Sequence, residues 1–346
     1  MSIKKLLCAS RTKSKLTAMF ARYLLEYFSS DNAFKLVVLY DTKIKGHDFE
    51  EDHSHEEADT LIPNQVLASI RDSTWREVCV WSPDTDVLTL RLDLVSHGHL
   101  EAQTQLKLLT GKDSKYREID VVERVQVIGA HKCQGLIGLH SFSGADWGGK
   151  FVGITKKTWV DAYMKLSEDD PVINCFRELG EVSIPNELVS NELPSKIKDF
   201  EMFVCRVYSS SGPTTLPALR WELFRSKNLE GEMLPPTRAS LLPHITRANY
   251  VAMRDKSYST NHPILPLIEQ SGWVEEDGMY VPGRCLRLPA PRAVLELTKC
   301  ACKSGCKGMR CACFKNALPC TPLCKCFVSD CTNVNRNEVR ESDDVD

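Results

Sequence analysis

Nine of the chain's 15 cysteines lie between Cys300 and Cys331, and this cluster constrains the fold more than any other feature of the sequence. The cysteines follow the spacing C-x-C-x3-C-x4-C-x-C-x6-C-x3-C-x-C-x4-C, with few large apolar residues between them. Because such a segment cannot bury a hydrophobic core, another source of free energy must fold it. Coordination of zinc by thiolates supplies that free energy.

The C-x-C pairs favour a zinc cluster with bridging sulfurs over independent tetrahedral sites. Three zinc ions need twelve ligand places, and nine cysteines fill these places when three sulfurs each bridge two ions. We therefore expect about three structural zinc ions. The predicted ligands are Cys300, Cys302, Cys306, Cys311, Cys313, Cys320, Cys324, Cys326 and Cys331.

Two alternatives to a structural zinc cluster stay open at this point. A metal-scavenging tail is one, although Phe314, Leu318 and Leu323 favour a defined shape. A disulfide knot is the other, but it needs an oxidising compartment and an even number of cysteines. The sequence contains no secretory signal and no apolar run as long as a membrane helix. We expect a protein of the nucleus, with the cytoplasm as the alternative, and no membrane partner.

The cysteine cluster is basic, whereas the rest of the chain is acidic. Residues 299–326 contain six basic residues and no acid, and the remainder contains 38 basic against 46 acidic residues. A compact basic module attracts polyanions. The whole run, including "LPCTPLCKC", resembles the tesmin-type CXC domain, whose members bind three zinc ions and contact DNA. The resemblance implies DNA as the partner, with Lys303, Arg310 and Lys315 as candidate contacts.

The first half of the chain alternates helical and strand patterns. Residues 14–29 predict an amphipathic helix, and "FKLVVLY" and "EVCVWS" predict strands. This alternation indicates an α/β domain with a largely parallel sheet. Functional residues gather at the carboxyl ends of parallel strands, where "SPDTDVL" places Asp84 and Asp86. The helix dipole alone also favours acids at a helix start, such as Glu57 and Asp59 in "HSHEEADT".

The order of these acids resembles the flap-endonuclease branch of the PIN-like nucleases. In that branch, paired acids begin a helix, a second pair ends a strand, and a third motif leads into a DNA-binding turn. Nearly the whole chain also resembles a group of transposon-derived animal proteins, through "HEEADT", "SPDTDVL" and "RWELFRSKNLEGEMLPPT". The resemblance implies Mg²⁺ ligands and phosphate-contacting lysines. The ligands are Glu57, Asp59, Asp84, Asp86 and Asp146, and the lysines are Lys156 and Lys157 in "GITKKTW".

These nucleases carry one more aspartate, on a first strand ahead of the other motifs. The present sequence has no strand ending in an acid before residue 31, so it predicts an N-terminally truncated nuclease fold. We therefore expect a zinc-cluster DNA-binding protein whose nuclease-like domain is inactive. The alternative is an active Mg²⁺-dependent, structure-selective DNA nuclease. A protein scaffold without nucleic acid is a third hypothesis, which only the acidic body favours.

The predicted organisation has five parts. Residues 1–165 form the PIN-like α/β domain, and residues 166–284 form an all-helical extension in which Trp221, Leu223 and Phe224 belong to the core. Residues 285–298 are a proline-rich connector. Residues 299–333 are the CXC zinc-cluster domain, and 334–346 are a disordered acidic tail.

Overall fold

The chain divides into two compact units, Met1–Arg284 and Cys285–Asp346. The structure is a computed structural model of all 346 residues. It describes residues 10–28, 36–46, 48–71, 76–100, 104–144, 149–181, 195–227, 233–283, 285, 298–303, 305–321, 324–326 and 331–334. The predicted acidic tail, apart from residue 334, and most of the predicted connector lie outside these ranges. Among the described helices, none is both long and apolar enough to cross a membrane.

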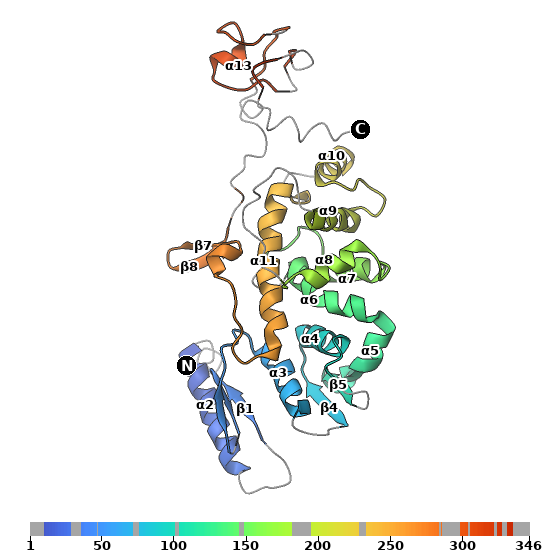
Figure 1. Ribbon diagram of the computed structural model, residues 1–346, viewed down its shortest axis with the longest axis vertical. Helices are drawn as coiled ribbons and strands as arrows, with labels where there is room; N and C mark the ends of the chain where they lie inside the picture. Colours follow the sequence, from blue (N-terminus) through green and yellow to red (C-terminus); the bar gives the residue numbers. More distant parts are fainter. Residues whose placement is uncertain are drawn as a thin grey trace. The chain divides into compact units, whose positions relative to one another are not determined.

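The first helix packs against a small antiparallel sheet (Figure 1). The helix is α2 (Ser10–Tyr27), and the strands are β1 (Val38–Tyr40), β2 (Lys43–Lys45) and β3 (Glu50–Asp52). The sequence predicted this helix and the first strand correctly. It assigned the strand to the wrong sheet, because β1 turns back through Asp41 (φ 51°) and pairs antiparallel with β2.

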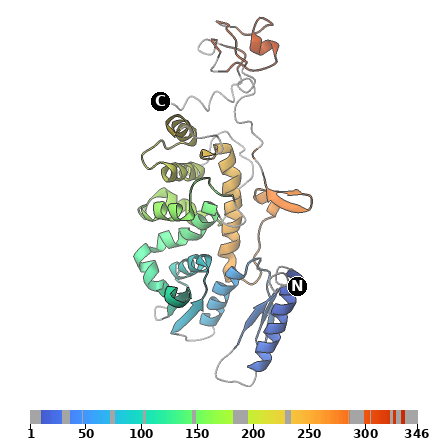
Figure 2. The ribbon, with the colours of Figure 1, turned by 180° about the vertical axis from the view of Figure 1, so that it is seen from behind.

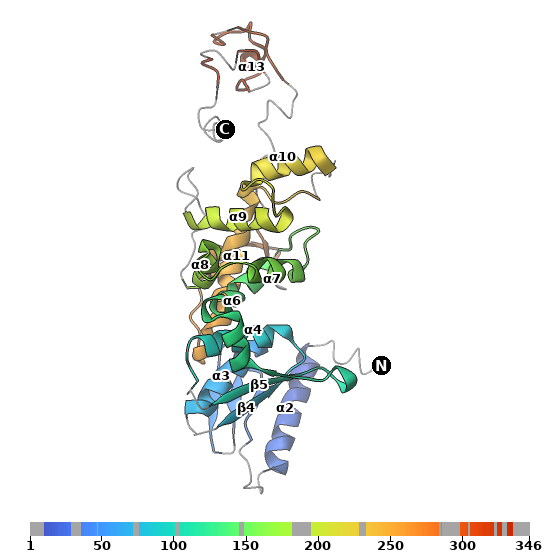
Figure 3. The same cartoon turned by 90° about the vertical axis from the view of Figure 1, so that its right-hand side faces the viewer.

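A second sheet carries the α/β part of the fold, in the order β4-β5-β6. Its elements are α3 (Ala58–Arg71), β4 (Glu77–Trp81), α4 (Thr85–Ser96), β5 (Gln105–Thr110), η1 (Asp113–Lys115) and β6 (Arg117–Asp120). Figure 3 shows β4 and β5 side by side, and they run parallel because α4 returns the chain between them. The connection from β5 to β6 is too short for such a crossover, so β6 pairs antiparallel. The expectation of a largely parallel sheet is therefore wrong: β4–β5 is the one parallel pair among the described strands.

Helices continue the unit after the sheet. They are α5 (Val121–Ile128), α6 (Ala130–Gly144), α7 (Lys156–Met164), α8 (Pro171–Glu178), α9 (Ser195–Tyr208), α10 (Leu216–Lys227) and α11 (Arg238–Lys256). The long helix α11 runs beside α6 and α9 (Figures 1 and 2). One hydrophobic core joins these helices to the sheet. At its centre, the buried ring of Phe142 contacts the rings of Phe151, Trp159, Phe176, Phe200 and His244.

Two features of the helical part differ from the prediction. The segment is not all helical, since it also contains η3 (Ser257–Ser259), η4 (Ile268–Ser271) and a hairpin of β7 (Trp273–Glu276) and β8 (Met279–Pro282). Asp277 and Gly278 both have positive φ, as the tight hairpin turn requires. In α10, Leu223 is buried as predicted, but Trp221 and Phe224 are 63% and 49% exposed. The helix packs through a narrow leucine stripe that leaves both rings on its outer side.

Within the described residues of the C-terminal unit, the regular structure is the short helix α13 (Ala312–Lys315). Its buried residues are mostly cysteines, joined by Leu318 and Thr321. Thiol groups therefore occupy the place that aliphatic side chains take in an ordinary core. This composition agrees with the prediction that a hydrophobic interior does not fold the segment.

Candidate functional site

The sulfur atoms of the nine clustered cysteines, Cys300 to Cys331, lie at distances expected of ligands that share metal ions. Cys300 Sγ is 3.4 Å from Cys326 Sγ, 3.8 Å from Cys306 Sγ and 3.9 Å from Cys320 Sγ. Two sulfurs bound to one tetrahedral zinc ion are about 3.8 Å apart, given a Zn–S bond of about 2.3 Å. The cluster could therefore hold zinc, and it fits a CXC-like domain.

The nine sulfurs form overlapping groups of four, with every sulfur pair in a group within 4.8 Å, and one division of them into three sets of four uses every cysteine. The first set is Cys300, Cys313, Cys320 and Cys324; the second is Cys300, Cys302, Cys306 and Cys311; the third is Cys306, Cys320, Cys326 and Cys331. Only Cys300, Cys306 and Cys320 belong to two sets each. The division uses all nine cysteines and contains the three shared sulfurs that the count of ligand places requires.

Hydrogen bonds from backbone N–H groups favour the thiolate form of two of these cysteines. Cys311 caps α13, and its sulfur accepts the N–H of Phe314 at 3.5 Å. Cys324 Sγ accepts the N–H of Cys300 at 3.4 Å. Burial raises the pKa of both thiols, but hydrogen bonds from backbone N–H groups and from neighbouring thiols together outweigh it and lower each pKa to about 7. A lowered pKa favours the form that binds metal.

The basic residues of this unit face solvent. The three residues that the CXC resemblance implies as DNA contacts, Lys303, Arg310 and Lys315, are all exposed. So are the other three cations of the segment, Lys299, Lys307 and Lys325. Their side chains surround a buried set of sulfurs, so the unit presents positive charge outward.

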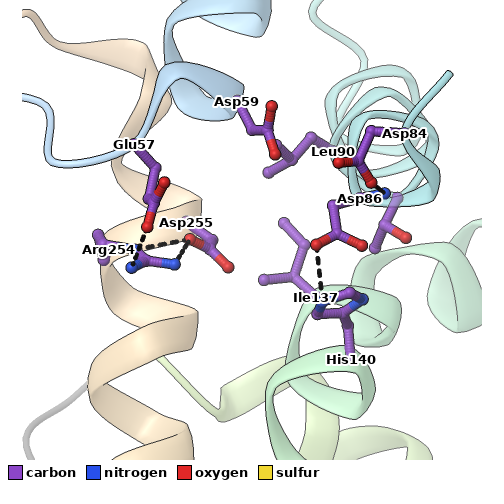
Figure 4. Close-up of a pocket in the computed structure, with 10 residues that line it drawn as sticks. Glu57, Asp59, Asp84, Asp86, Leu90, Ile137, His140, Arg254 and Asp255 are labelled. Atoms are coloured by element: carbon purple, nitrogen blue, oxygen red, sulfur yellow. Dashed lines mark hydrogen bonds and ion pairs between the residues drawn. The ribbon is translucent and has the colours of Figure 1, made fainter. Parts of the chain in front are cut away.

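A second candidate site is a pocket of about 240 Å³ in the first unit (Figure 4). It is lined by Glu57, Asp59, Asp84, Asp86, Thr89, Leu90, Ile137, His140, Arg254 and Asp255. Carboxylate oxygens of Asp59, Asp84 and Asp86 lie within 4.8 Å of one another. Four of the five acids predicted from the sequence therefore line one pocket, and three of them converge. The fifth, Asp146, lies outside the described residues.

Two helix starts bring these acids together. Strand β4 ends at Trp81, and Asp84 then caps α4 by accepting the N–H of Asp86 at 3.1 Å. Asp59 lies in the first turn of α3. Helix dipoles explain each acid separately, but they do not explain why both helix starts face one pocket. Burial raises the pKa of Asp59, and the charges of Asp84 and Asp86 raise it further.

Besides Thr89, three polar residues of the pocket were not among its predicted ligands. His140 of α6 lies with its Nε2 3.3 Å from Asp86 Oδ2. Arg254 of α11 places Nη1 3.5 Å from Glu57 Oε1 and Nη2 2.8 Å from Asp255 Oδ1. His140 stands just before the third motif, so its position in the sequence was a signal. Arg254 and Asp255 belong to no acid motif, and they lie on α11, far from the acid pairs in the sequence.

The two predicted DNA-contacting lysines of the first unit begin α7. Lys156 Nζ is 2.9 Å from His140 Nε2, which places Lys156 beside the carboxylate pocket. Lys157 Nζ is 2.5 Å from Asp161 Oδ2 on the same helix, and its side chain is 81% exposed. The two lysines thus have different neighbours, although they are adjacent in the sequence.

The sheet edge beside β4 is where the first strand of a PIN-like nuclease would be expected to pair. Strand β4 is the end strand in the order β4-β5-β6, and no described strand pairs with its other edge. An acid from a strand at that place is therefore absent from the described residues. Asp255 instead brings a further carboxylate to the pocket from α11.

Comparison with known proteins finds no match: no family model, no curated protein and no solved structure matches the chain. The structure itself defines a mixed α/β unit with a carboxylate pocket, followed by a cysteine cluster that can hold zinc.

Proposed function

We propose that this protein is a nuclear DNA-binding protein whose C-terminal unit is a three-zinc CXC module. The observation that carries the proposal is the proximity of the nine sulfurs, which can be divided into three sets of four with three shared members. When bound, the zinc ions would cross-link the segment and fix its loops. Cys300, Cys306 and Cys320 would bridge pairs of ions, and the remaining six cysteines would each bind one ion.

The charge of the module supports DNA as its partner. Three zinc ions and nine thiolates carry a formal charge of about −3, which the six exposed cations of residues 299–326 exceed. The cations lie outside the sulfur cluster, so they can reach phosphates while the cluster stays buried. Each lysine or arginine at a phosphate releases counterions, which gives binding that weakens as salt rises.

The test compares duplex DNA binding by the full chain with that of a Lys303→Ala/Arg310→Ala/Lys315→Ala variant. We expect the variant to bind DNA more weakly. The slope of log affinity against log salt concentration should also be smaller in magnitude by roughly 2 to 3. Lys115→Ala, an exposed lysine of the first unit, is the matched control and should bind as the wild type does. DNA binding that is unchanged in the triple variant, or that persists after zinc is chelated, would overturn the proposal.

A second candidate function is Mg²⁺-dependent cleavage of DNA at the carboxylate pocket. It is favoured by the convergence of Asp59, Asp84 and Asp86, to which α11 adds Asp255. Carboxylate oxygens are ligands that Mg²⁺ prefers, and a bound ion would stabilise negative charge on a phosphodiester. Of the chain's own groups, Lys156 stands at the pocket edge where it can hold a phosphate, and His140 orients Asp86. The resemblance to flap endonucleases supports the same chemistry.

A cleavage assay with flapped DNA and Mg²⁺ distinguishes an active nuclease from an inactive nuclease-like domain. The wild type, an Asp84→Ala/Asp86→Ala variant and an Asp169→Ala control are compared, since Asp169 is exposed and not among the pocket residues. Cleavage by the wild type and the control, lost in the double variant, is the expected result for an active site. If none of the three proteins cleaves DNA or binds Mg²⁺ in calorimetry, the domain is inactive and only the zinc module's function stands.

A further inference from the structure

Helix α10 exposes a pair of aromatic rings that neither candidate site uses. Trp221 is 63% exposed and Phe224 is 49% exposed. Their ring centroids are 6.2 Å apart with an angle of 30° between the ring planes. The two rings therefore form one continuous aromatic surface, which we term the α10 platform.

The platform is held by a well-anchored helix. Leu216 and Leu219 of α10 are fully buried, and Leu223 is 5% exposed. The N–H of Leu216 donates a hydrogen bond of 2.6 Å to the buried carboxylate of Glu201 on α9. Because the opposite face of α10 is fixed in this way, exposure of the rings is not a result of loose packing. The backbone of α10 therefore needs no further ordering before the two rings can bind a ligand.

The surroundings of the platform match a polyanion better than a protein. Among the α10 side chains whose burial is described, the other exposed ones are Pro217, Ala218 and Arg225, and none of them is a large aliphatic side chain. Protein-docking surfaces usually add apolar side chains around their aromatic anchors. By sequence, α10 contains three basic residues and one acid. Aromatic faces combined with cations are the features that bind single-stranded nucleic acids.

We propose that the α10 platform binds single-stranded nucleic acid by stacking unpaired bases on Trp221 and Phe224, with Arg225 at the backbone phosphate. The ring spacing supports a single strand. Successive nucleotides of a duplex strand advance by about 3.4 Å, so rings 6.2 Å apart match an extended, unstacked strand. This binding goes beyond the proposed zinc-module function and does not depend on it.

The first measurement is tryptophan fluorescence of the full chain titrated with oligodeoxythymidylate, and separately with oligouridylate. Stacking of a base on Trp221 quenches its emission. The two oligonucleotides show whether the platform prefers DNA or RNA, and either one binding supports the proposal. A polyphosphate of similar charge serves as the base-free probe and should not quench. Quenching by polyphosphate equal to that by the oligonucleotides would contradict stacking.

Substitutions in the platform test whether the binding and the fluorescence quenching arise there. Trp221→Ala and Phe224→Ala should each weaken single-strand binding by roughly 5- to 100-fold, because each removes one stacking partner. Trp221→Phe keeps a stacking ring, so it should retain most of the affinity while losing the quenching. Trp81→Phe is the matched control, since Trp81 is also 61% exposed but lies on β4; it should keep both affinity and quenching.

Failure of this inference is distinguishable from failure of the zinc-module function. In the Lys303→Ala/Arg310→Ala/Lys315→Ala background, Trp221→Ala should still cause the same fold loss of single-strand binding, and duplex binding should not respond to Trp221→Ala. Unchanged single-strand affinity in both Trp221→Ala and Phe224→Ala would overturn the inference. So would sedimentation showing that the wild type self-associates and that Trp221→Ala abolishes this association, because a second copy would then be the occupant.

Discussion

The sulfur atoms of Cys313 and Cys324 lie 3.5 Å apart, although the two cysteines are eleven positions apart in the chain. Both cysteines also lie within 4.8 Å of Cys300 and Cys320. This contact completes the first set of four and leaves Cys300 and Cys320 shared with the other two sets. In this division, Cys313 and Cys324 are terminal ligands, whereas Cys300 and Cys320 bridge.

Bridging and terminal cysteines should differ in their contribution to metal binding. Cys320→Ser removes a ligand from two sets, whereas Cys302→Ser removes a ligand from one. We expect the Cys302→Ser chain to retain at least two zinc ions, and the Cys320→Ser chain to lose metal at all three positions because two incomplete sets cannot support the third. Native mass spectrometry counts the ions directly. Equal zinc content in the two variants would contradict the assignment of bridges.

The buried histidine at the core centre should make the first unit sensitive to acid. Burial lowers the pKa of His244 to about 4, and its Nε2–H donates to the Phe142 carbonyl at 2.7 Å. The unfolded chain binds a proton near its usual pKa of about 6.5, so the unfolded state gains protons first as pH falls. The free energy of unfolding should therefore drop by about 3 kcal/mol between pH 6.5 and pH 4 through this group alone.

Denaturant unfolding at several pH values measures this effect. His244→Gln removes the titrating ring, so its stability should depend less on pH across that window. His131→Gln replaces an exposed histidine of α6 and should keep the wild-type slope. A His244→Gln protein with the same pH dependence as the wild type would show that other groups cause the acid sensitivity.

The close packing of α6 on α8 should not tolerate a methyl group at Gly138. A Cβ atom there would lie 2.2 Å from the Phe176 carbonyl oxygen, which is a backbone atom and cannot rotate away. We expect Gly138→Ala to reduce the free energy of unfolding by at least about 2 kcal/mol. His131→Ala on the exposed side of the same helix is the control. Denaturant midpoints within experimental error of each other for the two variants would refute this account of the contact.

Arg254 should limit how strongly the carboxylate pocket binds cations. Its guanidinium lies 3.5 Å from Glu57 Oε1 and 2.8 Å from Asp255 Oδ1, so it neutralises charge that a divalent ion would otherwise meet. Arg254→Met should raise Mg²⁺ or Mn²⁺ affinity by about tenfold or more and should lower stability in the absence of metal. Calorimetry of both proteins checks the first effect. An affinity that is unchanged or weaker in Arg254→Met would contradict it.

The features that could be predicted from the sequence are those that depend on residues close together in the chain. The cysteine spacing identified all nine thiols of the cluster, because ligands to shared ions must be close in a short segment. The pair Asp84 and Asp86 was predicted at the end of a strand, and the structure places it just after β4, where Asp84 caps α4. Acids that begin helices are visible in sequence because capping is local.

Contacts between residues that are far apart in the sequence could not be predicted from such local patterns. Asp255 and Arg254 come from the end of α11, nearly 200 residues after Glu57, and no local motif marks them. The hairpin of β7 and β8 was missed although its Asp277-Gly278 turn was a readable signal. Trp221 and Phe224 were assigned to the core because hydrophobicity alone cannot show which apolar face of a helix finds a partner.

The most direct test of the central claim is the zinc content of the purified full chain, measured by native mass spectrometry and by elemental analysis under reducing conditions. Nine thiols sharing three bridges predict three zinc ions per chain, with none remaining in a Cys300→Ser/Cys306→Ser/Cys320→Ser variant. A chain that contains no zinc, or a single ion, while its C-terminal unit stays folded would contradict the account.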